Sequence, residues 1–405
     1  MSKAQEREYD AIIVGGGPAG TSAAIRLAMA GARVLLAEQK RFPRHKLCGE
    51  FISPECLAHF AQLGASERML DAGGVWIKET RFYAPSGKSL RVPSAWLGEA
   101  SGAQALGLSR AEMDERLLRR AEDAGVDVRE GAQAVGLVIQ ETAIVRGVHL
   151  KDETGVYAAR AALTVDATGR ARSLARHVTG RAQRLSKRAT LIAFKAHFKD
   201  VRCDEEACEI YFYQGGYGGL NRVEGGSSNL CFIIAAQTAR EAKGDIERVM
   251  RDMIASNVRA AETLKNARRS SAWLSVALEG FGRSDLVLAP NLIAIGDAAS
   301  FIDPFTGSGM LMALESGEIA ARVIKAWLET PQRASFDALA AQYETHYESK
   351  FGARLRSCAR LRRAAFAPNF VAEAAVHILS ASEGIRRRLT RATRSNHLSN
   401  DCAFD

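Results

Sequence analysis

Hydrophobic and polar residues near the N-terminus alternate in two different ways. A β-branched run over Tyr9–Val14 leads into three closely spaced glycines, and apolar residues then follow a helical spacing over Thr21–Ala30. A second apolar run, Arg33–Ala37, comes directly after Gly31. This order of strand, glycine turn, helix and strand predicts a βαβ unit with two parallel strands.

Further segments with strand and helix patterns follow along the chain. An amphipathic helix is expected to run from Arg110 to Ala124, with Ser109 as its N-cap. Strands are predicted at 125–129, 162–166 and 291–295, and a long helix at 310–328. These pieces are expected to complete one sheet with the N-terminal βαβ unit.

Two intervening segments have a different character. Residues 75–107 and 185–278 contain short aromatic or alternating runs, which predict strands at 190–198, 209–213 and 228–234, and one helix is predicted at 245–261. From Phe336 onward the pattern is helical. A sheet domain inserted into a nucleotide-binding domain and followed by helices is the simplest organisation.

The positive charge of the chain is concentrated near its C-terminus. The 405 residues carry a net charge of +9, and Lys350–Arg394 holds eleven basic residues against Glu373 and Glu383. We expect this region either to attract an anionic membrane surface or an acidic carrier protein, or to pack on the body as a solvated basic face. Nucleic acid is not expected as a partner, because few aromatic residues lie between the arginines.

Cysteine usage and the N-terminal residues favour a cytoplasmic location. The seven cysteines are odd in number and form no C-x-x-C pair, and Ser2–Asp10 is polar rather than apolar. No apolar run approaches the roughly 20 residues that span a bilayer. We therefore expect a cytoplasmic protein, with peripheral membrane contact as an addition.

The glycine turn carries a dinucleotide-binding pattern. Gly15, Gly17 and Gly20 form G-x-G-x-x-G between a strand and a helix, and Glu38 ends the second strand. In such a unit the first glycine permits the tight turn, the second lets a pyrophosphate approach the backbone, and the third lets helix and strand pack closely. Glu38 is placed to accept hydrogen bonds from ribose hydroxyls.

Further motifs in the same order resemble FAD-dependent enzymes of the aromatic-hydroxylase superfamily, which also contains geranylgeranyl reductases and flavin-dependent halogenases. The resemblance covers roughly residues 9–330 and rests on the glycine turn, the Arg110 helix, Asp166-Ala-Thr-Gly169, Gly296-Asp297 and Pro304-x-x-Gly307-x-Gly309. It implies FAD as the cofactor, with Arg110 and Asp297 near its pyrophosphate and ribityl parts and Gly307 and Gly309 beside the flavin ring. The implied cofactor-binding residues are Gly15, Gly17, Gly20, Glu38, Arg110, Asp166, Gly169, Asp297, Pro304, Gly307 and Gly309.

The resemblance also implies the fold class. We expect an α/β protein with a Rossmann-type, glutathione-reductase-like FAD-binding domain formed by residues 1–74, 106–178 and 286–330. A mixed β-sheet substrate domain, residues 75–105 and 179–285, is inserted in it. Residues 331–405 form a C-terminal helical region.

The segment Pro43–Pro54 separates the branches of the superfamily. Its Lys46-x-Cys48-Gly49 stretch is similar to geranylgeranyl reductases, whereas Glu50 and Pro54 are similar to halogenases. The halogenase Trp-x-Trp-x-Ile-Pro motif is absent, since the four Trp are scattered at positions 76, 96, 273 and 327. The reductase Tyr-x-Trp-x-Phe-Pro stretch is replaced around Tyr217, where the Trp is lost.

Candidate catalytic residues are Cys48, Glu50 and Tyr217. Cys48 follows Arg44, His45 and Lys46, basic residues that favour a thiolate. The thiols of Cys203, Cys208, Cys231 and Cys358 are interpreted as small buried side chains. No spacing of metal ligands is present.

These observations predict an FAD-dependent oxidoreductase that takes electrons from transiently bound NADH or NADPH, because no second nucleotide fingerprint is present. We favour oxygen-dependent hydroxylation of an apolar or aromatic metabolite, the commoner use of this arrangement. Reduction of carbon–carbon double bonds in an isoprenoid or polyketide is the alternative. A flavin-binding protein without turnover is the least favoured hypothesis.

Overall fold

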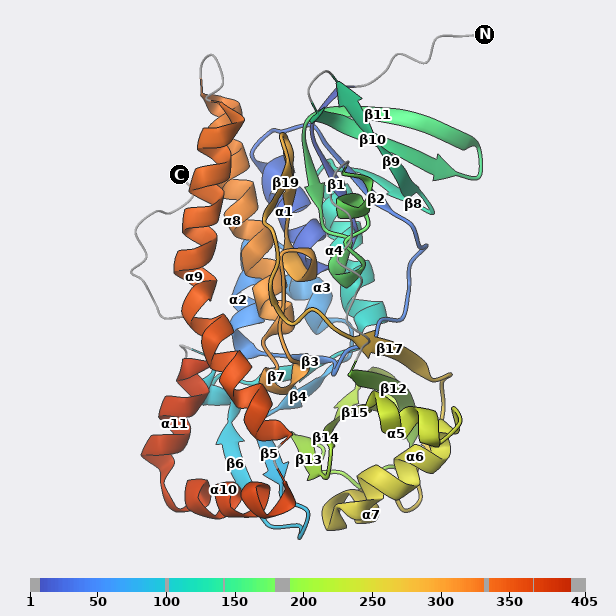
Figure 1. Cartoon of the computed structure of the whole chain (residues 1–405), viewed down its shortest axis with the longest axis vertical. Coiled ribbons are helices and arrows are strands. Elements are labelled where there is room, and N and C mark those ends of the chain that lie inside the picture. Colours follow the sequence, from blue (N-terminus) through green and yellow to red (C-terminus); the bar gives the residue numbers. More distant parts are fainter. Residues whose placement is uncertain are drawn as a thin grey trace.

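The computed structural model describes residues 8–98, 102–140, 143–178, 190–330, 335–366 and 368–394. Two large sheets lie one above the other along the length of the protein, and long helices run beside the upper sheet (Figure 1). All strands of the upper sheet lie within residues 8–166 and 287–294. All strands of the lower sheet lie within residues 79–93 and 191–278.

The upper sheet is a parallel sheet of the Rossmann type. Its central strand β1 (Glu8–Val14) lies between β11 (Gly155–Asp166) and β2 (Val34–Glu38), and all three are parallel. The sheet is extended by β8 (Asp127–Glu130), β20 (Leu292–Ala294), β19 (Val287–Ala289) and the antiparallel strands β9 (Gln133–Gln140) and β10 (Ile144–Asp152). The predicted α/β fold class is confirmed.

Three helices pack with this sheet around the nucleotide turn. Helix α1 (Pro18–Met29) contacts both α4 (Arg110–Asp123) and α8 (Gly309–Glu329). The predicted N-cap of α4 is present, because Ser109 Oγ accepts a hydrogen bond from the Glu112 amide at 3.2 Å. Helix α2 (Pro54–Gln62) contacts α8, and α3 (Ser66–Leu70) contacts α4. Strands β3 (Phe51–Ile52), β7 (Ala105–Gly107) and β4 (Val75–Ile77) form a small separate sheet.

The lower sheet presents one face to helices and the other to the FAD-binding domain. Its strands are β5 (Glu79–Tyr83), β6 (Ser89–Pro93), β12 (Leu191–Lys199), β13 (Ala207–Tyr213), β14 (Gly216–Val223), β15 (Ser227–Ala235), β16 (Arg268–Arg269) and β17 (Leu274–Leu278). On β12, Phe194, Ala196 and Phe198 pack in one hydrophobic cluster with residues of the helices. Since side chains alternate along a strand, Lys195 and His197 point to the opposite face.

The predicted helix at 245–261 is wrong in one respect, because it is broken. The structure has α6 (Ile246–Met253) and α7 (Val258–Leu264), preceded by the short α5 (Ala236–Glu241). The break falls at Asn257, a fully buried residue. Its side-chain amide donates to the backbone carbonyls of Tyr83, Ala84 and Phe212, and its oxygen caps α7, which accounts for the interruption.

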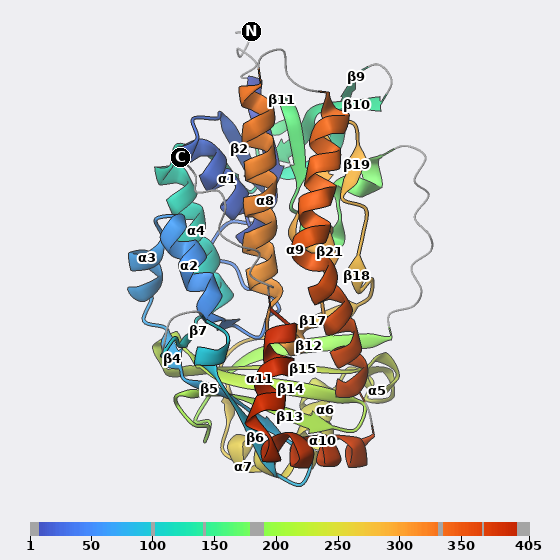
Figure 2. The ribbon, with the colours of Figure 1, turned by 90° about the vertical axis from the view of Figure 1, so that its left-hand side faces the viewer.

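The C-terminal region is helical, as predicted. Helix α9 (Phe336–Ala365) runs beside α8 and is held to it by the buried ion pair of Arg354 with Glu315 (2.7 Å). Helices α10 (Asn369–Ala381) and α11 (Glu383–Ala392) then turn across the end of the lower sheet (Figure 2). Among the residues described, no helix combines the length and the apolar character that crossing a bilayer requires.

Candidate functional site

The glycine turn is a close backbone contact that side chains would block. Gly15 has a φ of +115°, and a Cβ on it would lie 2.3 Å from the Ala167 carbonyl oxygen. A Cβ on Gly20 would lie 1.9 Å from the Gly15 carbonyl oxygen. Gly17 is the N-cap of α1. The turn therefore brings the helix N-terminus, with its free amides, to the carboxyl end of β1.

Glu38 lies at the end of β2 beside this turn, where the sequence predicted it. Its carboxylate is buried, and Oε2 accepts a hydrogen bond from the Gly16 amide at 2.9 Å. Oε1 accepts from the Lys40 amide at 3.0 Å. These contacts fix the orientation of the carboxylate at the rim of the nucleotide turn.

Two guanidinium groups converge on the same place. Both are held by Asp114, whose side chain is fully buried: Oδ2 lies 2.9 Å from Arg44 Nη1, and Oδ1 accepts from Arg110 Nε at 2.8 Å. Each guanidinium also reaches to about 4 Å from the position that a Cβ on Gly17 would take. Arg110 was predicted here from the sequence, whereas Arg44 and Asp114 were not.

Lys46 adds a third positive charge to this cluster. Burial lowers the pKa of Lys46, and the neighbouring charges of Arg110 and Arg44 lower it further, while Asp297 raises it. The repulsion between cations at a helix N-terminus is relieved when a diphosphate binds between them. The glycine cradle, the buried acid and the cations together fit the ADP half of FAD.

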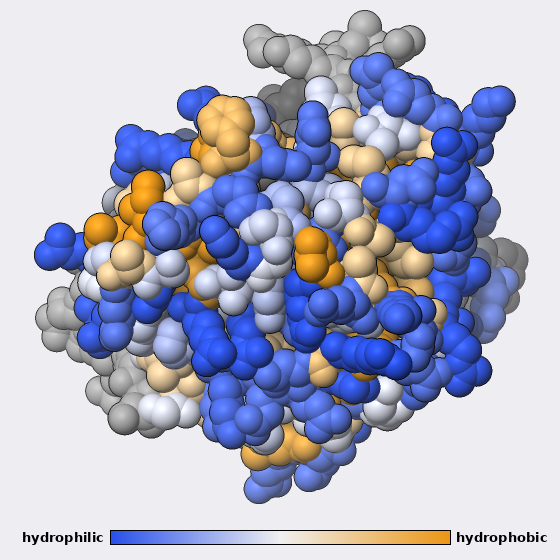
Figure 3. Space-filling view, turned by 90° about the horizontal axis from the view of Figure 1, so that it is seen from below, coloured by the Kyte–Doolittle hydropathy of each residue, from blue (hydrophilic) through white to orange (hydrophobic). Residues whose placement is uncertain are grey.

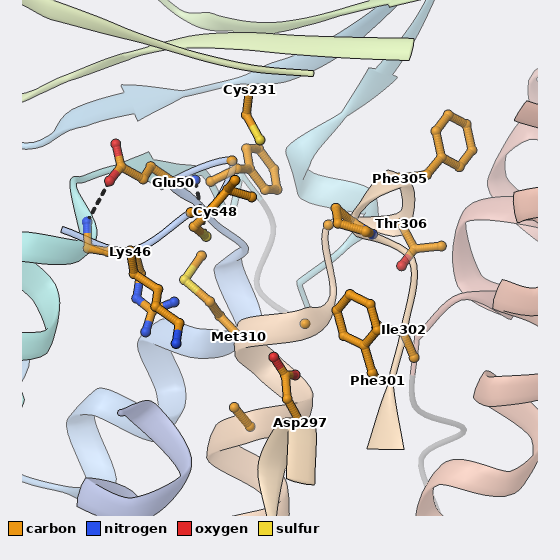
Figure 4. Close-up of a pocket in the computed structure, with 18 of the residues that line it drawn as sticks. Lys46, Cys48, Glu50, Cys231, Asp297, Phe301, Ile302, Phe305, Thr306 and Met310 are labelled. Atoms are coloured by element: carbon orange, nitrogen blue, oxygen red, sulfur yellow. Dashed lines mark hydrogen bonds between the residues drawn. The ribbon is translucent and has the colours of Figure 1, made fainter. Parts of the chain in front are cut away.

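The predicted flavin-side motif lies across the cavity from this cluster. Asp297 lies in a short 3-10 helix, and burial raises its pKa against the opposing effects of Arg170 and Lys46. Gly307 has a φ of +60°, and Gly309 begins α8 with no atom within 4 Å of a Cβ placed on it. Pro304, Gly307 and Gly309 all line the cavity, and Met310 at the start of α8 lies beside them (Figure 4), so the N-terminus of α8 borders the space that a flavin ring would take.

Asp166 does not line the cavity, unlike Pro304, Gly307 and Gly309. It ends β11, and its Oδ1 accepts from the Thr168 amide at 3.0 Å, while the neighbouring Gly169 lines the cavity. Asp166 itself is fully buried behind that turn, with Oδ2 unpaired. The geometry favours a role for Asp166 in shaping the turn rather than in direct contact with FAD.

The loop that carries Cys48 and Glu50 is held from the lower sheet. Glu50 is fully buried with a φ of +55°, and its carboxylate pairs with Lys195 through Oε1 and with His197 Nε2 through Oε2 at 2.7 Å. Oε1 also accepts from the Arg110 amide at 2.8 Å. Burial raises the pKa of Glu50, but the hydrogen bond from His197 and the charge of Lys195 outweigh it, so that the pKa is lowered. Glu50 therefore joins the two domains as a carboxylate.

Two asparagines of the lower sheet complete this clamp. Asn229 Nδ2 donates to the Cys48 carbonyl at 3.1 Å, and Asn221 Nδ2 donates to the Glu50 carbonyl at 3.2 Å. Cys48 Sγ accepts from the Glu50 amide at 3.4 Å and lies in the cavity wall near Cys231 (Figure 4). The thiol of Cys48 is thereby fixed on the cavity side of a loop with little freedom to move.

Tyr217 lies in the wall of the cavity below the flavin-side motif. Its hydroxyl is hydrogen-bonded to Asp303, the N-cap of the short helix that carries Pro304. Burial raises the pKa of Tyr217 well above its ordinary value, and it also raises the pKa of Asp303. The second oxygen of Asp303 is buried without a hydrogen-bond partner. The Tyr217 hydroxyl therefore keeps its proton and lies beside a buried carboxyl group.

Most other cysteines are buried thiols, as predicted from the sequence. Burial raises the pKa of Cys56, Cys208 and Cys231 to about 12, and it also raises the pKa of Cys203 and Cys358. Cys402 lies outside the described residues. Among the thiols described, Cys48 stands apart because it is partly exposed and lines the cavity.

One cavity connects the nucleotide turn, the Cys48 loop, the flavin-side motif and Tyr217. It has a volume of about 950 Å³ and runs from the nucleotide turn, past the flavin-side motif, to a chamber between the lower sheet and helices α10 and α11. The chamber is lined by apolar side chains of the sheet and of the C-terminal helices, among them Phe82, Leu90, Ile210, Phe212, Val376 and Leu379. A chamber of this kind suits an apolar substrate.

The fold and the site together define a FAD-dependent oxidoreductase. Residues 8–340 match the family described as FAD binding domain, and the chain belongs to that family. It is 28% identical over 361 residues to menaquinone reductase of Mycolicibacterium smegmatis, covering 86% of this chain and 83% of the relative. It is 27% identical over 353 residues to digeranylgeranylglycerophospholipid reductase 2 of Methanopyrus kandleri, covering 85% and 83%.

Solved structures share the whole fold. A geranylgeranyl bacteriochlorophyll reductase-like protein from Thermoplasma acidophilum superposes with a TM-score of 0.77 at 22% identity, covering 95% of this chain and 96% of that protein. The flavin-dependent brominase Bmp2 superposes with a TM-score of 0.78 at 22% identity, covering 96% and 93%. The fold is therefore shared by reductases and halogenases, and it does not by itself select the reaction.

Proposed function

We propose that the protein reduces carbon–carbon double bonds in the isoprenoid chain of a lipid or quinone, with FAD as the hydride carrier and NADH or NADPH as the transient electron donor. The observation that carries this proposal is the continuous cavity, which joins the FAD-binding turn to a long apolar chamber. The names of the two relatives quoted above support reduction of such substrates. Because of these names we prefer reduction of carbon–carbon double bonds to the hydroxylation that the sequence alone favoured.

The residues of the chain fit the needs of this reaction. Reduced FAD, held by the glycine turn, Glu38 and Arg110, would supply a hydride to one carbon of the double bond, and a proton would have to reach the other carbon, so that two hydrogens are added in total. Tyr217 lines the chamber and holds a proton, and its hydroxyl donates a hydrogen bond to Asp303. We assign this pair the role of proton donor.

The Cys48 loop serves the same cavity from the other side. The clamp by Lys195, Asn221 and Asn229 fixes the Cys48 side chain where it meets substrate or flavin. A fixed thiol in the wall restricts the positions that a double bond can take. Cys48 is proposed as a catalytic residue, and Glu50, which acts through this loop, as a positioning residue.

The reaction is tested by adding substrates in the absence of oxygen. Purified holoenzyme is mixed with menaquinone and, separately, with a geranylgeranylated phospholipid, together with NADH or NADPH, under argon and in air. Product that forms under argon and is two hydrogens heavier than the substrate supports reduction. For menaquinone the product is first reoxidised in air, so that the quinone ring is restored and only a reduced side-chain double bond keeps the added mass. Product that forms only in air and contains one added oxygen atom would establish hydroxylation instead.

A further inference from the structure

Helix α10 is apolar on both of its sides. Val376 and Leu379 face inward and pack with Leu90 of the lower sheet, on the cavity side. The outer side carries Phe370, Ala374, Ile378 and Ala381, spaced so that they lie along one face of the helix. The exposed fractions of Phe370 and Ile378 are 73% and 61%. A surface helix of this composition exposes a face that water does not favour.

Exposed arginines lie next to this face, on α11. Arg387, Arg388 and Arg391 are exposed, and Ile385 beside them is 47% exposed. We call Phe370, Ala374, Ile378, Ala381, Ile385, Arg387, Arg388 and Arg391 the α10–α11 surface. The space-filling view from the end of the protein where α10 lies shows apolar surface bordered by hydrophilic residues (Figure 3).

Other arginines of the basic C-terminal region are used within the protein. Arg354 pairs with Glu315, Arg386 donates to the Leu379 and Ser380 carbonyls, and Arg394 donates to the Thr306 carbonyl. These contacts show that not every basic side chain of the C-terminal region is available to a partner. Arg356, Arg360 and Arg363 on α9 are exposed, and so are Arg387, Arg388 and Arg391 on α11. The arginines of α11 follow the apolar helix α10 directly in the chain, and the two helices are in contact.

The cavity opens at the same place. Val371 and Leu389 both line the cavity, and their exposed fractions are 37% and 40%. Side chains that border both the chamber and the solvent mark its mouth between α10 and α11. The entrance therefore lies at the edge of the apolar face of α10.

We propose that the α10–α11 surface docks on an anionic lipid bilayer, so that the mouth of the cavity faces the membrane. Apolar side chains enter the headgroup region while the arginines meet lipid phosphates, the combination typical of interfacial helices. A second copy of the chain fits less well, because a symmetric contact would bring the arginine groups of both copies together. The proposal concerns a location and goes beyond the reaction, whichever substrate is reduced.

The test is co-sedimentation of the holoenzyme with vesicles of phosphatidylcholine, with and without phosphatidylglycerol. We expect binding to the anionic vesicles that falls as salt is raised. The variant F370S/I378S is expected to lower the partition coefficient about tenfold, since two apolar anchors are lost. The variant R387Q/R388Q/R391Q is expected to lower it about tenfold or more at low salt.

Matched controls separate this surface from general effects. M29S/V156S removes two exposed apolar side chains elsewhere, and R240Q/K243Q/R251Q removes the same charge from another face. Both are expected to bind like the wild type, and FAD absorbance checks that every variant is folded. Absence of sedimentation with anionic vesicles at low salt, or equal losses in the controls, would overturn the proposal. Two other results would also overturn it. One is dimerisation without vesicles that only F370S/I378S abolishes, and the other is binding of an acidic carrier protein that only F370S/I378S abolishes.

Discussion

Glu50 and Lys195 form an ion pair across the boundary between the FAD-binding domain and the lower sheet, with 0% and 1% of their side chains exposed. His197 approaches the other carboxylate oxygen to 2.7 Å. A single acid thus holds the Cys48 loop against the sheet that lines the substrate chamber. The two domains are therefore fixed to each other at the point where cofactor and substrate meet.

Removing the charge of Glu50 should destabilise the protein. Glu50→Gln leaves the buried ammonium of Lys195 without a counter-charge, and breaking such a pair costs roughly 3–5 kcal/mol. Urea unfolding of the apoprotein measures the change. Glu206→Gln, which removes an exposed pair with Lys78, is the control and should cost less than about 1 kcal/mol. Similar small losses in both variants would contradict a structural role for the Glu50 pair.

The same pair predicts an acid-dependent loss of stability. The pKa of Glu50 is lowered in the folded protein relative to its ordinary value of 4.5, so its contribution is complete above pH 4.5 and is lost as pH falls toward the lowered pKa. The difference in unfolding free energy between wild type and Glu50→Gln should therefore be constant above pH 5 and shrink below pH 4.5. Denaturation curves over this range measure it, and a difference that grows toward low pH would contradict the ion pair.

Glu38→Arg should weaken FAD binding. It replaces the acceptor beside the nucleotide turn with a cation and removes the bond to the Gly16 amide. We expect the Kd for FAD to rise about tenfold or more, equivalent to about 1.4 kcal/mol. Titration of apoprotein with FAD, followed by flavin fluorescence, gives the constant. Glu153→Arg, an exposed site paired with Arg41, is the control, and equal affinities in both variants would remove Glu38 from the site.

Cys48→Ala should lower turnover while leaving FAD bound. The side chain lies in the cavity wall and its loop is held by the backbone bonds to Asn221 and Asn229, which alanine does not disturb. We expect kcat to fall about tenfold or more. FAD absorbance and steady-state rates are measured together. Cys203→Ala, outside the cavity, serves as the comparison, and equal rates for the two variants would assign Cys48 to packing.

Tyr217→Phe should slow the reaction by removing the proposed proton donor, by roughly 10²-fold. The pKa of Tyr217 is raised well above 10, so the wild-type hydroxyl keeps its proton and its activity should not fall as pH rises through the neutral range. Asp303→Asn should produce a similar loss with an altered pH profile. Tyr211→Phe, which faces the helices and pairs with Glu209, is the control. Unchanged turnover in Tyr217→Phe would require another donor.

The FAD half of the site could be predicted from the sequence because its chemistry is local. Gly15, Gly17 and Gly20 lie within one turn, and at Gly15 and Gly20 backbone groups approach so closely that side chains are excluded. Glu38 follows at the end of the next strand, a position that the βαβ geometry fixes. Short-range constraints of this kind appear directly in the order of residues.

The clamp on the Cys48 loop could not be predicted in the same way. Glu50 and Lys195 are 145 positions apart, and their meeting depends on how the two sheets pack. The sequence nevertheless contains a signal for Lys195 and His197, because they are polar residues at alternate positions of an aromatic strand. Strand β14 was also missed, because its glycines disfavour strands by propensity, although Gly216 is required by a Cβ position 2.1 Å from the Ile233 carbonyl oxygen.

The discontinuous FAD-binding domain has a consequence for how the protein is made. Synthesis runs from the N-terminus, and the βαβ unit with its glycine turn leaves the ribosome first. The turn packs on Ala167, Arg110 belongs to α4, and the flavin-side amides belong to residues 307–309 at the start of α8. The lower sheet is translated before that last segment. The chain therefore spends most of its synthesis as apoprotein, and the cofactor site is complete before α10 and α11, which supply Val376, Leu379 and Leu389 to the substrate chamber, have been translated.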